Sequence, residues 1–200
     1  MSRILEVALV VEDMLSLVVM AKLLTHTGRG YAVKRQLVER GFGNIRRSVV
    51  KYRNASHALP HVVLTDLDQA ACPPFLREQW GVATLPNSML FRVAVREVEA
   101  WLLADRVGFS DFAGIASNKV SQEPESLVDP KQTLLNLVRR SRNRRLAMEL
   151  VPAHGSNMSI GPLYNERMST FVTERWDVGV AMESAPSLKR TVDRLHTFLK

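Results

Sequence analysis

The sequence predicts an α/β protein in which a mainly parallel sheet flanked by helices is followed by a mostly helical C-terminal half. In the first half, apolar β-branched segments typical of buried strands alternate with segments of helical periodicity. Strands separated by helices favour right-handed crossovers and therefore a parallel sheet. From residue 108 onward the apolar positions follow helical spacing, and no segment has the composition of a strand.

The expected elements follow from apolar runs bounded by prolines and glycines. Strands are predicted at residues 4–11, 45–52, 61–65 and 89–95. Helices are predicted at residues 14–24, 31–40, 73–80, 97–105, 131–140, 142–150, 162–175 and 187–200, with a polar loop at 153–160. We therefore expect a core at residues 1–107 and a helical elaboration packed on it at residues 108–200.

The composition indicates one globular core. The chain has 200 residues, of which 46% are hydrophobic and 24% are charged, and this excludes collagen-like, coiled-coil and disordered classes. A single cysteine, Cys72, cannot form an internal disulfide, so we expect a cytoplasmic protein. Glu12 and Asp13 interrupt the most apolar stretch, which argues against a membrane span, and we expect no cleaved secretory leader.

Basic residues are concentrated in two segments. The net charge is +7, yet residues 29–53 contain eight basic side chains and one acid, and residues 131–148 contain six basic side chains and no acid. Clustered lysine and arginine on an otherwise acidic chain are typical of a polyanion partner such as nucleic acid. Two solvated helix faces would give the same pattern, and charge alone does not separate these interpretations.

Acidic residues follow three of the predicted strands. Glu12 follows the first, Asp66 and Asp68 follow the strand at 61–65, and Glu97 and Glu99 follow the strand at 89–95. Because ligands of open parallel sheets bind outside the carboxyl ends of the strands, we expect these side chains to cluster. If the backbone stays extended, Asp66 and Asp68 point the same way and can share a hard divalent cation.

Each acid also has a structural explanation. Asp66 is a residue type that ends strands or caps helices, and Glu12 is favoured by the dipole in the first turn of a helix. Glu97 and Glu99 face different directions on a helix, so at most one of them points at the site. The coincidence of three strand ends is what favours a metal site over three unrelated structural acids.

Four other features have ordinary structural interpretations. His26 beside the glycine turn is expected to form loop hydrogen bonds, and Cys72 is expected to be a buried small side chain. Trp101 is expected to pack in the core. The Gly28 and Gly30 pair lacks the third glycine of a dinucleotide fingerprint, which excludes Rossmann-type cofactor binding.

These acidic positions resemble a known pattern. Glu12 after the first strand and Asp66-Leu67-Asp68 after a later one are similar to the Toprim domain of topoisomerases, primases and OLD-type nucleases. A family of uncharacterised prokaryotic Toprim-like proteins, often encoded beside an ATPase, is resembled more closely by the segments at 64–69, 72–73, 96–105, 28–34, 161–165 and 187–188. The family motif has glycine after the glutamate and a further acid downstream, whereas Asp13 follows Glu12 here. Two interpretations follow: Asp13 replaces the missing acid, or the site has lost a ligand.

The resemblance implies Mg²⁺-dependent phosphodiester cleavage, with Mn²⁺ as a substitute ion, in a phage-defence setting with an ATPase partner. Asp66 and Asp68 would hold the metal, Glu12 would bind it or act as general acid or base, and Glu97 or Glu99 would complete the catalytic set. Basic residues near the glycine turn would contact the phosphates of nucleic acid: Arg29, Lys34 and Arg35.

Two other functions fit the same sequence. A non-catalytic subunit that binds nucleic acid or an ATPase partner would keep the fold and the basic patches without turnover. It differs from the enzyme in metal dependence, because it should retain polyanion affinity after its carboxylates are neutralised. A nucleotide-hydrolysing or nucleotidyl-transferring enzyme would share the metal site but accept a small substrate.

Overall fold

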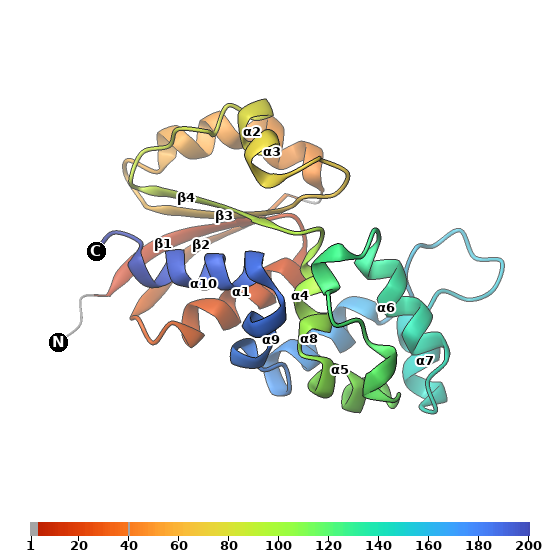
Figure 1. The fold of residues 1–200 in the computed structure, drawn as a ribbon. Coiled ribbons are helices and arrows are strands. Elements are labelled where there is room, and N and C mark those ends of the chain that lie inside the picture. The colour runs from red at the N-terminus through yellow and green to blue at the C-terminus, as the bar shows by residue number, and fades with distance from the viewer. Residues whose placement is uncertain (1–3, 40) are drawn as a thin grey trace. The chain divides into compact units, whose positions relative to one another are not determined.

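A computed structural model describes residues 4–39 and 41–200 of the chain (Figure 1). These residues form two compact units. Unit 1 comprises Met1–Val95 together with Ser187–Lys200, and unit 2 comprises Arg96–Pro186. The boundary expected between residues 107 and 108 lies inside unit 2, within helix α5 (Arg106–Ala113).

A four-stranded parallel sheet forms the centre of unit 1. Its strands are β1 (Leu5–Val11), β2 (Tyr31–Val38), β3 (His61–Asp66) and β4 (Met89–Ala94), and their order in the sheet is β2-β1-β3-β4. β1 pairs with β2 on one side and with β3 on the other, so β2 and β4 are the edge strands. The predicted α/β class with a parallel sheet is confirmed.

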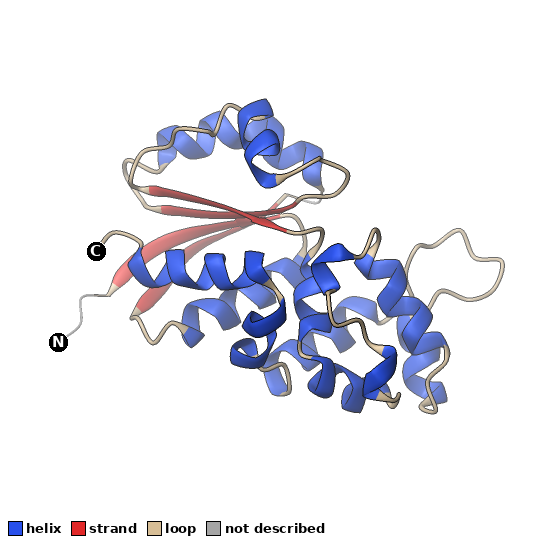
Figure 2. Ribbon diagram, in the orientation of Figure 1, coloured by secondary structure: helices blue, strands red, loops and turns tan. Residues whose placement is uncertain are grey.

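Four helices cover the two faces of this sheet. Figure 1 shows α1 (Met14–His26) and α10 (Pro186–Thr197) on one face and α2 (Phe42–Ala55) and α3 (Pro73–Gln79) on the other. Figure 2 shows the same layers by secondary structure. The chain leaves unit 1 after Val95 and returns at Ser187, and the Val95 N–H donates a hydrogen bond of 3.2 Å to Ser187 Oγ.

Two elements of unit 1 differ from the sequence prediction. The helix predicted at 31–40 is strand β2, although residue 40 itself lies outside the described residues. The register of β2 shifts between Val33 and Arg35, so Lys34 is an extra residue in the strand. This bulge breaks the alternation expected of a strand, and the exposed polar residues around it resemble a helix surface in sequence.

The strand predicted at 45–52 is instead part of helix α2. Its β-branched residues suggested a strand, but Ile45, Val49 and Tyr52 are spaced by four and three positions and form one buried helix face. Val50 on the opposite face is 52% exposed. The 3.6-residue period therefore decides the structure of this segment, and β-propensity does not.

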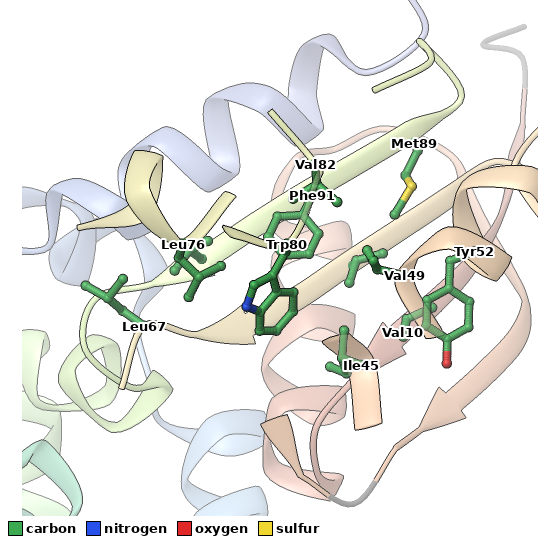
Figure 3. Close-up of a cluster of buried hydrophobic side chains, with 12 residues drawn as sticks. Val10, Ile45, Val49, Tyr52, Leu67, Leu76, Trp80, Val82, Met89 and Phe91 are labelled. Atoms are coloured by element: carbon green, nitrogen blue, oxygen red, sulfur yellow. The ribbon is translucent and has the colours of Figure 1, made fainter. Parts of the chain in front are cut away.

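The core between the sheet and helices α2 and α3 is drawn in Figure 3. The rings of Trp80 and Phe91 meet edge to face with centroids 5.7 Å apart. Ile45 and Val49 of α2 pack into the same cluster as Val63 of β3. Both rings lie in the protein interior. This packing fixes the position of β3, whose end carries the acidic residues.

Unit 2 is helical in all its regular structure. Besides α5 it contains α4 (Val98–Ala104), α6 (Pro130–Arg139), α7 (Arg144–Leu150), α8 (Tyr164–Glu174) and α9 (Val178–Ser184), with two 3₁₀ turns at Ser117–Lys119 and Pro124–Ser126. Every residue of α4 is buried, and this helix contacts α5, α6 and α9. The predicted helical second half is thus confirmed, but α5 and α9 were not predicted. Among the described residues no helix is both long and apolar enough to traverse a lipid bilayer.

Candidate functional site

The candidate site lies at the carboxyl ends of β1 and β3. These strands are neighbours in the sheet, but the chain continues from β1 to β2 on one side and from β3 to β4 on the other. Open parallel sheets bind ligands at such switch points, because the connections diverge and leave a crevice. Glu12 directly follows β1 and Asp66 ends β3, so the sheet brings these two predicted residues together.

The Glu12 carboxylate is bonded directly to the end of β3. Its Oε1 accepts a hydrogen bond of 2.9 Å from the Asp66 N–H and another from the Thr65 hydroxyl. Thr65 lies within the motif that suggested the site, but nothing in the sequence indicates its bond to Glu12. These two donors hold the Glu12 side chain against the end of β3.

Burial raises the pKa of the Glu12 carboxyl above its ordinary value, because the charged form loses contact with water. The hydrogen bonds from Thr65 and Asp66 favour the charged form and lower the pKa in part. The negative charges of Asp68 and Asp13 raise it further. Glu12 and Asp68 are therefore close enough to repel each other, as the clustering argument predicted.

Asp66 and Asp68 are not aligned by an extended backbone. Asp66 is only 9% exposed at the end of β3, whereas Asp68 has a left-handed φ of 49°. The Ala70 N–H donates to the Leu67 oxygen at 3.0 Å, which closes a turn around Asp68. The extended backbone that would point both carboxylates the same way is therefore absent. Asp68 is brought to the site by this turn.

Asp13 has a structural task. It is the N-cap of α1, and its Oδ1 accepts a hydrogen bond of 2.8 Å from the Ser16 N–H. A carboxylate that caps a helix stabilises the first turn through this bond and through the helix dipole. Asp13 therefore acts on the site through its charge, and its acceptor oxygen Oδ1 is engaged by the helix.

Glu97 and Glu99 belong to unit 2 and have partners there. Glu97 precedes α4, and its Oε2 accepts a hydrogen bond of 2.9 Å from the Lys131 N–H. Glu99 is fully buried, with its Oε1 2.9 Å from the Tyr164 hydroxyl and 3.3 Å from Lys131 Nζ. Both residues thus connect α4 to other helices of unit 2, and their catalytic role stays a prediction.

The three predicted nucleic-acid contacts lie in and before β2. Arg29 donates to the backbone oxygens of Leu195 at 3.0 Å and Phe198 at 2.6 Å, so its guanidinium holds the end of α10. Lys34 forms an exposed ion pair of 2.9 Å with Glu6. Arg35 is exposed on the edge strand. Lys34 and Arg35 are therefore available to a polyanion, whereas Arg29 already has a structural role.

Cys72 and Trp101 were both expected to lie in the protein interior, and this prediction is wrong for Cys72 and confirmed for Trp101. Cys72, expected to be buried, is exposed at the N-cap position of α3, because the two prolines after it begin the helix at the surface. Trp101 is fully buried in α4, as expected, and the Trp176 indole N–H donates to its backbone oxygen at 3.2 Å.

Glu12→Gln should stabilise the metal-free protein at neutral pH. The amide keeps an oxygen for the Thr65 and Asp66 donors but removes a buried negative charge that Asp68 and Asp13 repel. We expect a melting temperature a few degrees above that of the wild type, measured by circular dichroism in a chelator. Glu78→Gln, which removes a charge from an exposed position on α3, should leave it unchanged. A lower melting temperature for Glu12→Gln would contradict this electrostatic account.

No group of three or more histidine, cysteine, aspartate or glutamate side chains suited to holding a metal ion occurs among residues 4–39 and 41–200. Glu12, Asp66 and Asp68 therefore do not form a complete set of metal ligands by themselves. Magnesium seldom needs one, because it is usually held by one or two carboxylates together with water and substrate phosphates. No protein-family model, curated protein or solved structure matches this chain.

Proposed function

We propose that this chain is a Toprim-like, Mg²⁺-dependent protein that cleaves phosphodiester bonds in nucleic acid. The observation that carries the proposal is the partly buried Glu12 carboxylate, bonded to the end of β3 and repelled by Asp68. Adjacent carboxylates at a switch point are stabilised when a divalent cation neutralises them. The donor set consists of oxygens only, and this set suits Mg²⁺ or Mn²⁺.

The residues divide into two roles. Asp66 and Asp68 would hold the ion, whose positive charge offsets the negative charge that develops on the phosphate. Hydrolysis adds water across a P–O bond, so hydroxide joins phosphorus and a proton goes to the leaving oxygen. Glu12 would supply that proton, because its carboxyl is bonded to the end of β3 beside Asp66. Thr65 orients Glu12 for this role through its hydroxyl.

Exposed cations support a nucleic-acid substrate. Helix α2 carries Arg46, Arg47 and Lys51 on its exposed surface, in the same unit as the carboxylates. The part of the chain from α6 to α7 adds exposed arginines in unit 2: Arg139, Arg140, Arg142, Arg144 and Arg145. Such side chains neutralise backbone phosphates without reading sequence. A cytoplasmic location, an ATPase partner and a part in phage defence are proposals that follow from the resemblance alone.

The same cations favour one alternative, a non-catalytic subunit that binds nucleic acid or accompanies an ATPase. Such a subunit needs the basic surfaces but not the carboxylates. Its affinity for DNA should therefore survive the loss of the acidic residues.

The deciding experiment is a calorimetric titration of Mn²⁺ and Mg²⁺ into the full chain and into Asp66→Asn/Asp68→Asn. We expect binding by the wild type and a loss of about tenfold or more in affinity for the double variant, since each ligand carboxylate contributes more than 1 kcal/mol. Asp111→Asn/Glu183→Gln removes the same charge from two exposed positions of unit 2 and should bind as the wild type does.

The titration is followed by cleavage assays on plasmid DNA and on RNA with Mn²⁺. Cleavage by the wild type and by the control variant, but not by Asp66→Asn/Asp68→Asn, would support the enzyme. If the wild type binds no Mn²⁺ at millimolar concentration, with or without DNA, the enzyme proposal fails. Unchanged DNA affinity in the double variant would then favour the non-catalytic subunit.

A further inference from the structure

A cavity of about 560 Å³ opens beside the edge strand β4 in unit 1. Residues of the loop before β4, of β4 itself and of the end of α10 form its wall. Neither Glu12 nor Asp66 is among its lining residues, so it is separate from the carboxylate site. Its basic lining residues come from three elements and the chain end: Arg77, Arg92, Arg194 and Lys200.

Three of these side chains form what we call the arginine cluster: Arg77 of α3, Arg92 of β4 and Arg194 of α10. α3 and α10 cover opposite faces of the sheet, so the cluster gathers at the outer edge of β4 (Figure 1). The charges are close enough for Arg77 and Arg194 both to lower the pKa of Arg92, to which Arg190 of α10 also contributes.

Hydrogen bonds to neutral groups hold two members of the cluster in place. The Arg77 guanidinium donates to the backbone oxygen of Phe91 at 3.2 Å and to that of Val82 at 3.0 Å. Arg92 Nε donates to the Thr191 hydroxyl oxygen at 3.2 Å. These bonds fix the positions of the guanidinium groups but leave their positive charges uncompensated.

No carboxylate of the described part of the chain forms an ion pair with a member of the arginine cluster. Asp193, which neighbours Arg194 in α10, pairs with Lys189 at 2.8 Å. Burial is the main cause of a fall in the pKa of Arg92 to about 10, and the neighbouring arginines lower it further. Gathering like charges at a partly buried site is unfavourable, and a bound anion would remove that cost.

We propose that the arginine cluster binds a phosphate-bearing ligand with at least two negative charges. Guanidinium groups match the oxygens of a phosphate through paired hydrogen bonds, and several of them together favour a multiply charged anion. The cavity is larger than a phosphate group alone and lies within the range typical of small-molecule sites. Leu85 and Phe198 give it an apolar wall beside the cluster, which suits the remainder of a nucleotide.

The test is a calorimetric titration of inorganic pyrophosphate into the full chain at moderate salt. We expect the wild type to bind, and Arg92→Gln and Arg194→Gln each to lose about tenfold or more in affinity, as is typical of charge-assisted hydrogen bonds. Arg194 is exposed, so its substitution should leave the fold intact even if the Arg92 variant unfolds. Arg175→Gln removes an exposed arginine of unit 2 and controls for net charge.

Binding that is lost in both cluster variants and kept in Arg175→Gln would support the site. Equal losses in all three variants would show diffuse electrostatic attraction and would overturn the proposal, as would no binding by the wild type.

Parallel titrations with adenosine triphosphate and with a 5′-phosphorylated oligonucleotide identify the source of the phosphate. If one of these two binds more tightly than pyrophosphate, and if its binding depends on Arg92 and Arg194 in the same way, it identifies the chemical class of the natural ligand. Since Asp66→Asn/Asp68→Asn leaves the cluster intact, it should bind pyrophosphate as the wild type does.

Discussion

Asp105→Ala should destabilise the protein by about 2–5 kcal/mol, because it leaves two backbone donors without their acceptor. Asp105 is 3% exposed and lies between α4 and α5. Its Oδ1 accepts a hydrogen bond of 2.9 Å from the Gly108 N–H, and its Oδ2 accepts one of 2.9 Å from the Asp177 N–H. One carboxylate thus caps α5 and fixes the residue that caps α9.

Urea denaturation followed by tryptophan fluorescence measures this loss. Asp129→Ala is the matched control, since Asp129 is an exposed N-cap with a single bond of 2.7 Å to the Gln132 N–H. We expect that control to lose about 1 kcal/mol. Asp105→Asn keeps one acceptor oxygen and should fall between the two. Equal losses for Asp105→Ala and Asp129→Ala would mean that the bond to Asp177 contributes nothing to the stability of unit 2.

Gly161→Ala is expected to cost about 3 kcal/mol, because the added methyl group collides with backbone atoms that have no room to move. A Cβ at Gly161 would lie 2.5 Å from both the Glu149 oxygen and the Leu150 carbonyl carbon. The Gly161 N–H also donates to the Leu150 oxygen at 2.8 Å, so the chain is held against the end of α7. Separating the two segments to admit the methyl group would break this bond.

Gly43→Ala is the same substitution in a different setting and should have the opposite sign. Gly43 lies in α2, and no atom is within 4 Å of the position a Cβ would take. Alanine there should stabilise the helix by about 0.5–1 kcal/mol. Thermal unfolding of the two variants measures the contrast. A Gly161→Ala protein as stable as the wild type would show that the end of α7 can move aside.

The fold class could be predicted because its signals are local. Buried strands such as β3 contain a run of apolar and β-branched residues, and helices of unit 2 such as α6 have a clear 3.6-residue period. The predictions for residues 31–40 and 45–52 assigned a helix in place of a strand and a strand in place of a helix. Both errors occur where local signals conflict. β2 is an edge strand with a bulge, and α2 contains β-branched residues on a helical face. Only the tertiary context decides such segments.

The candidate site was predicted in part for a topological reason. Placing acids after strands is enough to bring Glu12 and Asp66 together, since parallel strands end at the same edge of a sheet. The sequence does not show that Thr65 bonds Glu12 or that Asp68 lies in a left-handed turn. The arginine cluster could not be predicted, because Arg77, Arg92 and Arg194 are far apart along the chain. Arg92 lies on β4 and the other two lie on helices that cover the sheet, so only the tertiary structure brings the three together.

The hydrogen bond between Val95 and Ser187 bears on how such a chain can evolve. It joins the two positions at which unit 2 departs from and returns to unit 1. Closing a loop of about 90 residues costs little more entropy than closing one of half that length, so the size of the segment between these positions is weakly constrained. A gene could therefore acquire, lengthen or exchange this segment at a single place while the sheet and its last helix stay compatible. If relatives of this chain differ in length, we expect the differences to lie in unit 2 rather than in the sheet of unit 1.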